Sequence, residues 1–227
     1  MIIAVTGLAR EARIVAGPGI TALSCGGRAG LLRESLERAT TKHTAGIISI
    51  GIAGGLSRSL KSGDCVIAYE IVSEGQHIPT DALWRQRLAA RLPDAVVAPI
   101  AGSQGIVLGR TSKADLFHAT GAYAVDMESH IAARFASEHR IPFAALRAIA
   151  DPAASELPAL VAGAITPAGR VNRLGVLKAV LFDPRQVPAL IRTARESKAG
   201  FDALLRCRGV LGPGLAGPDG SELALDM

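Results

Sequence analysis

The chain has 227 residues, of which 49% are hydrophobic and 4% aromatic, so it is long and apolar enough for one globular domain. This composition excludes intrinsic disorder for most of the sequence. The net charge of +5 is concentrated in residues 170–208, where nine basic residues stand against three acidic ones, and the remainder is close to neutral.

The three cysteines, Cys25, Cys65 and Cys207, lie far apart and without CxxC spacing. This favours a reducing compartment over a disulfide framework. The first residues, Met1–Thr6, lack the basic region and the length of a signal peptide, and no apolar run reaches the roughly 18 residues of a membrane span. We therefore expect a cytoplasmic protein.

Short runs rich in β-branched residues alternate with amphipathic stretches through the first two thirds of the chain. We expect strands at Ile2–Thr6, Gly46–Ile50, Cys65–Val72, Gly105–Leu108, Ala122–Asp126 and Phe143–Ile149, and helices at Arg28–Ala39, Thr80–Arg91 and Glu128–His139. This alternation predicts an α/β fold with a mixed, largely parallel sheet and helices on both faces.

After Asp151 the pattern is helical, broken by prolines, and ends in an amphipathic helix over about residues 187–207. We expect a single domain over residues 1–208, of which 170–208 form a basic helical extension. Glycine and proline recur in residues 209–227, which predicts a flexible tail.

Three acidic residues follow two of the expected strands: Asp126, Glu128 and Asp151. Parallel strands would end at one edge of the sheet, which would place these carboxylates around a single crevice. Each pattern also has a structural interpretation, since Asp126 can cap a helix, Glu128 can complement the helix dipole, and Asp151 precedes a proline as a turn residue often does. A carboxylate and a methionine side by side would equally suit a sugar, with Met127 against its apolar face.

A glycine-rich turn, Gly51–Leu56, follows an apolar strand but does not have the GxGxxG spacing of a dinucleotide site. Taken in order, four motifs resemble the purine nucleoside phosphorylase and nucleosidase superfamily, over residues 1 to about 155. These motifs are Ile48–Leu56, Lys61–Ile67, Ala124–Glu128 and Arg147–Asp151. The resemblance implies a three-layer nucleoside phosphorylase-like fold and cleavage of an N-ribosidic bond.

The resemblance implies a role for each matching residue. Glu128 would hold the ribose hydroxyls, Met127 would pack on the sugar, Asp151 would protonate the purine at N7, and Arg147 would position groups in the site. An acid at the departing base makes chemical sense, because the base gains negative charge as the bond breaks. Further substrate contacts are expected from Ala53, Gly54, Asp126, Arg110, Thr111 and His77, the last of these at the 5′ side of the substrate.

The sequence departs from the family at the group that attacks the sugar. The glutamate with which nucleosidases activate water aligns with Ala12. Glu11, one residue earlier, would take this catalytic role if the loop shifts, although one residue on a helix turns a side chain by about 100°. The serine of many phosphorylases aligns with Ile52. Arg28, at a helix start, would supply a phosphate contact together with Arg110 and Thr111. Hydrolysis and phosphorolysis both remain open, with phosphate as a possible co-substrate. The serine before the catalytic aspartate is also replaced, by Ala150.

The basic C-terminal segment is similar to that of the hopanoid-associated phosphorylases, which implies adenosylhopane as substrate and release of adenine. Its charge would also suit an anionic membrane surface, a solvated helix face or a contact between subunits. The competing functions are a methylthioadenosine or adenosylhomocysteine nucleosidase and a non-catalytic nucleoside-binding protein that docks on membranes.

Further partners follow from composition and family. Nucleic acid is not expected, since Phe201 is the single aromatic of the basic amphipathic helix over residues 187–207 and offers no stacking platform. The five histidines have no metal spacing, and we expect neither a metal nor an organic cofactor. The resemblance implies a homo-oligomer, with a dimer as the first expectation.

Overall fold

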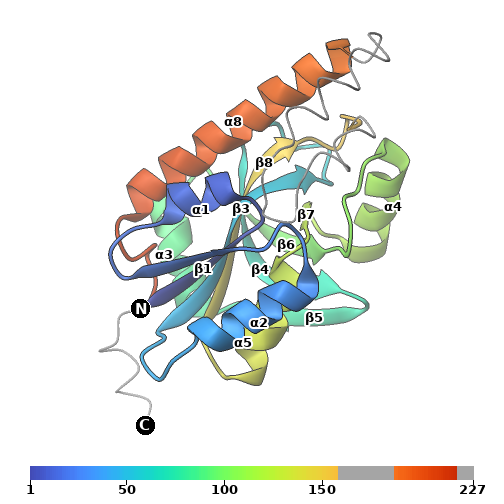
Figure 1. Cartoon of the computed structure of the whole chain (residues 1–227). Helices are drawn as coiled ribbons and strands as arrows, with labels where there is room; N and C mark the ends of the chain where they lie inside the picture. The colour runs from blue at the N-terminus through green and yellow to red at the C-terminus, as the bar shows by residue number, and fades with distance from the viewer. Residues whose placement is uncertain (158–186, 219–227) are drawn as a thin grey trace.

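Five strands close into a ring at the centre of the computed structural model (Figure 1). The longest strand, β3 (Gly46–Gly55), pairs in parallel with β8 (Phe143–Asp151) and in antiparallel with the short β7 (Ala124–Asp126). β8 pairs with β4 (Cys65–Ser73), β4 with β6 (Val96–Gly102), and β6 with β7. The last pairing closes the ring.

The structure describes residues 1–157 and 187–218. β1 (Ile2–Thr6) and β2 (Ile20–Ser24) extend the sheet beyond β3, and β5 (Gln76–Pro79) extends it beyond β4. The helices in these residues are α1 (Ala9–Val15), α2 (Ala29–Ala39), α3 (Ala82–Arg91), α4 (Arg110–Thr120), α5 (Ser129–Glu138) and α8 (Val187–Leu211). The predicted mixed α/β fold is confirmed.

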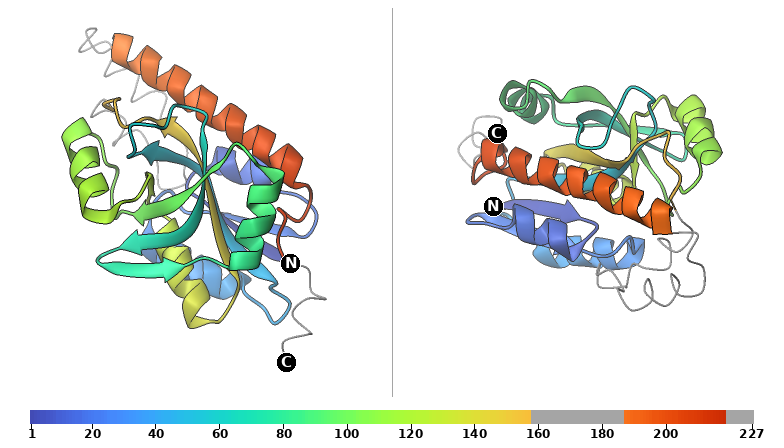
Figure 2. Two further views of the ribbon diagram at one scale, coloured as in Figure 1. Left: turned by 180° about the vertical axis from the view of Figure 1, so that it is seen from behind. Right: turned by 90° about the horizontal axis from the view of Figure 1, so that it is seen from above.

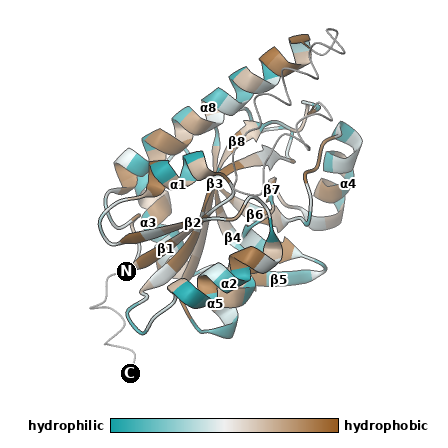
Figure 3. Cartoon of the chain, in the orientation of Figure 1, coloured by the Kyte–Doolittle hydropathy of each residue, from teal (hydrophilic) through white to brown (hydrophobic). Residues whose placement is uncertain are grey.

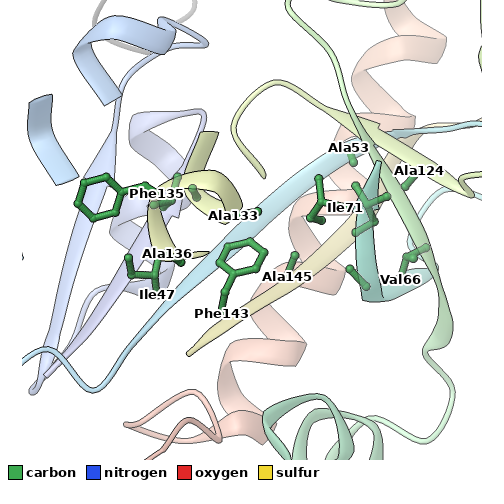
Figure 4. Packing of buried hydrophobic residues seen from close by; sticks show 14 of the residues in the cluster. Ile47, Ala53, Val66, Ile71, Ala124, Ala133, Phe135, Ala136, Phe143 and Ala145 are labelled. Atoms are coloured by element: carbon green, nitrogen blue, oxygen red, sulfur yellow. The ribbon is translucent and has the colours of Figure 1, made fainter. Parts of the chain in front are cut away.

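Helices cover both faces of the sheet, as the alternating pattern predicts. α2 and α5 pack on one face around an apolar cluster that includes Phe135 and Phe143 (Figure 4). α1, α3 and α8 pack on the other face around Trp84 and Leu204. α1 and α8 run side by side when the molecule is seen from above (Figure 2), and α8 alternates hydrophobic and hydrophilic residues along its length (Figure 3). Each helix thus turns one apolar face inward.

The two strands that carry the candidate site are buried on both faces. Every residue of β8 is buried, and in β3 only Ile52 and Gly54 are partly exposed. Such strands need near-continuous apolar runs, which is why both were recognisable in the sequence. Alanines dominate β8, and they leave room for α8 to pack closely: a Cβ atom on Gly200 would lie 2.8 Å from Ala150 Cβ.

The expected strand at Gly105–Leu108 is wrong, since these residues form the loop before α4. The strand in this region is β6, whose Pro99 argues against a strand in sequence reasoning. Pro99 is tolerated because the register between β4 and β6 shifts between Ala68 and Ile71, so the ladder has an irregularity there. Two short edge strands, β2 and β5, were also not predicted.

The expected geometry at the carboxyl ends of the strands is wrong as well. β7 runs antiparallel to β3 while β8 runs parallel to it, so the two acidic strand ends do not share one edge of a parallel sheet. They lie close to β3 for a different reason: Gly54 pairs with Val125 on one side and with Asp151 on the other. β3 therefore separates the two acidic ends.

The C-terminal segment is ordered further than predicted. α8 continues to Leu211, and Leu215 is fully buried, with its carbonyl accepting a hydrogen bond from Trp84 Nε1 at 3.0 Å. Up to residue 218 the expected flexible tail is therefore packed against α3, because Leu215 fills the core beside Trp84. Residues 219–227, and residues 158–186 of the expected helical extension, lie outside the described residues. None of the described helices is long and apolar enough to cross a bilayer.

We predict that Gly200→Ala destabilises the protein. The new Cβ would meet Ala150 and the Ile149 carbonyl oxygen, which belong to a rigid buried strand. Overpacking of this kind typically costs about 1–3 kcal/mol, against a gain in helix propensity of up to about 1 kcal/mol. Urea unfolding monitored by circular dichroism measures the difference.

Gly209→Ala is the matched control in the same helix. No atom lies within 4 Å of a Cβ at this position. This variant should be as stable as the parent or slightly more so, because only the propensity term remains. Equal midpoints for the two variants would contradict the close packing of α8 on β8.

Candidate active site

A fully buried arginine organises the first part of the site. Arg147 lies on β8 beside Gly51 of β3 and has no solvent exposure. Its Nη2 contacts the carboxylate of Asp126 and donates hydrogen bonds to Ser49 Oγ and Ser129 Oγ. A buried cation needs such partners, since an unpaired charge would be very costly away from water. Nε and Nη1 of Arg147 have no hydrogen-bond partner in the part of the chain that the structure describes.

Asp126 is engaged on all sides by the protein. Besides Arg147, it accepts hydrogen bonds from the Ser129 amide at 3.1 Å and from the Ser129 hydroxyl. It thus holds the start of α5, which supports the capping interpretation of this acid. The geometry does not favour the predicted contact between Asp126 and substrate. Asp126 is 7% exposed, and both of its carboxylate oxygens already have partners within the protein.

Glu11 points into the site, although Ala12 is the aligned position. Glu11 is the third residue of α1, and its Oε2 accepts from the Leu8 amide at 2.6 Å, as in a capping box. Its Oε1 accepts from the Ile52 amide at 2.7 Å. A Cβ on Gly51 would lie 2.6 Å from Glu11 Oε1 and 2.7 Å from Arg147 Nη1, so both groups meet over this glycine. Burial raises the pKa of Glu11, and Arg147 opposes the shift.

Glu128 completes this group of charges. Its carboxylate lies over Gly7, where a Cβ would come within 2.9 Å of Oε1, and Oε2 is 3.9 Å from Arg147 Nη2. Burial raises the pKa of Glu128 to about 8; Arg147 opposes the shift, and Asp126 and Glu11 add to it. One guanidinium thus faces three carboxyl groups, and burial raises the pKa of two of them, Glu11 and Glu128.

Met127 covers the turn that precedes α2. Its methyl carbon would lie 2.5 Å from a Cβ on Gly27, whose φ of +73° also favours glycine. The Gly26 amide donates to the Gly7 carbonyl at 3.1 Å. The loops that start α1, α2 and α5 therefore meet beside Glu128.

Asp151, at the end of β8, forms a second centre. It pairs with Gly54 of β3, three residues after Gly51, which pairs with Arg147. Asp151 is 6% exposed, and its Oδ2 lies 2.6 Å from Nζ of Lys113, which is itself buried. Burial raises the pKa of Asp151 to about 6; the Lys113 ammonium opposes the shift, and Glu196 adds to it. Gly54 faces this group, with 3.7 Å between its ideal Cβ and Asp151 Oδ2. Ala53, which is 7% exposed, lies between the two centres.

Sequence reasoning did not select Lys113, although it selected the nearby Arg110 and Thr111. Arg110 and Thr111 are exposed in the first turn of α4, whereas Lys113 faces inward. The sequence of α4 has no clear apolar stripe to show which side faces inward, so Lys113 has the pattern of a surface residue. Lys113 supplies a contact to Asp151 where Ala150 has no hydroxyl to offer.

Two other predicted residues lie apart from both centres. Arg28 is exposed at the start of α2. His77 is exposed on the edge strand β5, with Nδ1 3.1 Å from Glu70 Oε2. Neither makes a recorded contact with Glu11, Glu128 or Asp151.

We predict that Glu128→Gln stabilises the protein at high pH. Because the folded-state pKa is raised from 4.5 to about 8, protonated Glu128 favours the fold below pH 4.5, and this contribution is lost as the pH rises through 8. The variant cannot ionise, so its stability relative to the parent should increase between pH 5 and pH 9 by more than about 1 kcal/mol. Urea midpoints across this range measure the trend.

Glu138→Gln provides a control of opposite sign. Glu138 is exposed and paired with Arg33, which lowers its pKa. Its contribution is present above pH 4.5 and fades as the pH falls, so this variant should lose a little stability at neutral and high pH. A parallel response of the two variants would contradict the burial of Glu128.

Comparison with known proteins places this site in a family. The sequence matches the phosphorylase superfamily over residues 29–181. No curated protein sequence matches the chain.

Similar folds occur among solved structures. A 5′-methylthioadenosine/S-adenosylhomocysteine nucleosidase from S. pneumoniae has a TM-score of 0.59 at 17% identity, covering 90% of this chain and 98% of its own. The futalosine hydrolase of Helicobacter pylori has a TM-score of 0.57 at 17% identity, covering 88% and 97%. A nucleosidase from Colwellia psychrerythraea in complex with adenine has a TM-score of 0.57 at 17% identity, covering 67% and 83%. These likenesses concern the fold, and the sequence match over two thirds of the chain shows that the protein belongs to the phosphorylase superfamily.

Proposed function

We propose that this protein hydrolyses the N-ribosidic bond of a 5′-substituted adenosine and releases adenine. One observation carries the proposal: two centres of different character lie along β3. The first joins Glu11 and Glu128 to the buried Arg147, and the second holds Asp151 as a separate acid of raised pKa. Cleavage of such a bond needs both, because positive charge develops on the sugar and negative charge on the base.

Asp151 is the proposed general acid. With a pKa of about 6, roughly a tenth of Asp151 is protonated at pH 7, which is enough for rapid proton transfer. As the bond between C1′ and the purine nitrogen breaks, its electron pair moves into the base and N7 takes the proton from Asp151. Adenine then leaves as a neutral molecule.

Glu11 is the proposed base that activates water. Its carboxylate and the free Nη1 of Arg147 meet over Gly51, so Nη1 would donate to the water oxygen while Glu11 accepts its proton. The oxygen then bonds to C1′, and the products are the 5′-substituted ribose and adenine. Phosphate receives less support: Arg28, Arg110 and Thr111 are exposed, and Ile52 offers only its amide, which Glu11 occupies.

Glu128 and Met127 are the proposed ribose contacts. Within residues 1–157 and 187–218 no side chain donates a hydrogen bond to the Glu128 carboxyl group, which leaves it available to ribose hydroxyls at the junction of three loops. The Glu11 carboxylate, the proposed base, lies in the same centre and would stabilise a developing positive charge on the sugar ring. The thioether of Met127 would face the apolar side of the ring.

Two observations bear on the identity of the 5′ substituent: the substrates named for proteins of similar fold, and the exposed side chains of α8. Similar folds belong to proteins named for 5′-methylthioadenosine, S-adenosylhomocysteine and futalosine. We propose adenosylhopane for this chain, supported by the exposed cations Arg192, Arg195 and Lys198 on α8, with Ile191 47% exposed beside them. The same surface would contact an anionic membrane. Homo-oligomer formation remains a prediction from the family.

An adenine-release assay tests the reaction. The purified protein is incubated with methylthioadenosine, adenosylhomocysteine and adenosylhopane, each with and without phosphate, and free adenine is measured. We expect release without phosphate and its loss in Glu11→Gln, because the amide cannot accept the proton of water. Release that requires phosphate would point to phosphorolysis, and absence of release from all three would favour the nucleoside-binding alternative.

Asp151→Asn tests the acid. The amide has nearly the same shape but cannot donate the carboxyl proton, so turnover of a purine nucleoside should fall about 10²- to 10⁴-fold. Circular dichroism and the urea midpoint verify that the variant is folded. Near-normal turnover in a folded Asp151→Asn protein would contradict the assignment.

A further inference from the structure

The ammonium group of Lys113 faces four acceptors, and three of them lie within 3.0 Å. The fourth, the Asp151 carbonyl oxygen, is 3.5 Å from Nζ. Nζ lies 2.6 Å from Asp151 Oδ2, 2.9 Å from the Pro152 carbonyl and 3.0 Å from the Ser155 carbonyl. An ammonium has three N–H donors, so these contacts use all of them. Since the side chain is only 1% exposed, water does not compete for these donors.

The two carboxyl oxygens of Asp151 therefore differ. Oδ2 accepts from Lys113, whereas Oδ1 is buried and has no hydrogen-bond partner within residues 1–157 and 187–218. A proton on Oδ2 would face a fixed positive charge, which is unfavourable in a site of low dielectric constant. The proton of the neutral acid thus belongs on Oδ1.

We propose that Lys113 is a positioning residue that reserves Oδ1 of Asp151 for the proton delivered to the leaving purine. This inference rests on the proposed function, in which Asp151 is the acid. The O–H bond at Oδ1 breaks as the purine N7 gains the proton and the base takes the electron pair of the bond to C1′. The carboxylate that remains is already paired with the ammonium, so the charge left after transfer is compensated.

Lys113 also connects the acid to the segment that follows β8. The Pro152 and Ser155 carbonyls that it holds belong to the turn after Asp151, and the Leu157 amide donates to the Leu108 carbonyl at 3.1 Å. The start of α4 and the turn after β8 are therefore held together on both sides of Lys113. Such anchoring fixes the direction in which Oδ1 points.

Two charges from α8 also act on Asp151. Glu196 raises its pKa, whereas Arg192 lowers it, as Lys113 does from α4. Ser155 Oγ donates to Glu196 Oε1 at 2.6 Å, which places this acid beside the same turn. Removing the positive charge of Lys113 and removing the negative charge of Glu196 should therefore shift the titration of Asp151 in opposite directions.

The test compares Lys113→Met with Glu196→Gln. Asp151 is titrated by ¹³C NMR in the protein without substrate, and kcat/KM for adenine release is measured against pH. We expect the Asp151 titration and the decline of activity at high pH to move to higher pH in Lys113→Met and to lower pH in Glu196→Gln. Adenine release by Lys113→Met should fall about ten- to a hundredfold, since the acid is misdirected.

A second substrate separates proton delivery from general damage. 4-Nitrophenyl riboside releases nitrophenolate, which leaves without a proton, so Lys113→Met and Asp151→Asn should both retain nearly the parent rate with it. Equal losses on both substrates, with an unshifted titration, would overturn the role of Lys113. Should Lys113→Met fail to fold, Lys113→Arg answers the same question, because it keeps the charge but moves the donors: selective loss of adenine release supports the proposal, and equal loss overturns it.

The outcomes for the two proposals are distinct. If the parent protein releases no adenine, the proposed function fails and the catalytic role of Lys113 fails with it. If the parent is active and the pH midpoint of the Asp151 titration is the same in both variants as in the parent, only the inference about Lys113 fails.

Discussion

The burial of Arg147 is the constraint on which the site depends. A guanidinium without solvent exposure requires a carboxylate and further acceptors, and removal of one partner of such a pair typically costs about 3–5 kcal/mol. Asp126, Ser49 and Ser129 are the partners of its Nη2, and they come from β7, β3 and α5. The same cation moderates the repulsion between Glu11 and Glu128. One buried charge thereby fixes the loops that surround the proposed ribose site.

Sequence reasoning found the parts of this arrangement that follow from strong local patterns. β3 and β8 are long apolar runs, and charged residues at such positions, among them Arg147 and Asp151, stand out. The closure of the ring was not predictable, since β7 has only three residues and its direction is set by its neighbours. The orientation of Glu11 depends on where α1 begins, and that of Lys113 on which side of a polar helix faces inward. Both are decided by packing that no local pattern records.

The distance between the two centres along β3 gives each acid its own environment. Around Gly51 three carboxyl groups share a single guanidinium, and burial raises the pKa of Glu11 and Glu128 while Arg147 opposes the shift. Beside Gly54, Asp151 is paired with the ammonium group of Lys113, and the carboxylate of Glu196 on α8 also acts on it. A short strand could not separate these environments, so the ten residues of β3 are matched to the chemistry proposed for them.

The closed ring also limits how this sheet can associate with other sheets. Six of the eight described strands have neighbours on both sides, so within the described residues only β2 and β5 present a free edge. β5 has four residues and ends in Pro79, and His77 Nδ1 lies 3.1 Å from Glu70 Oε2 on the neighbouring β4, while α1 and α2 flank the five residues of β2. Short, charged or covered edges discourage strand addition and aggregation. In this chain, which is 49% hydrophobic, the main-chain hydrogen-bonding groups of the strands are therefore paired within the chain and seldom offered to the strands of other molecules.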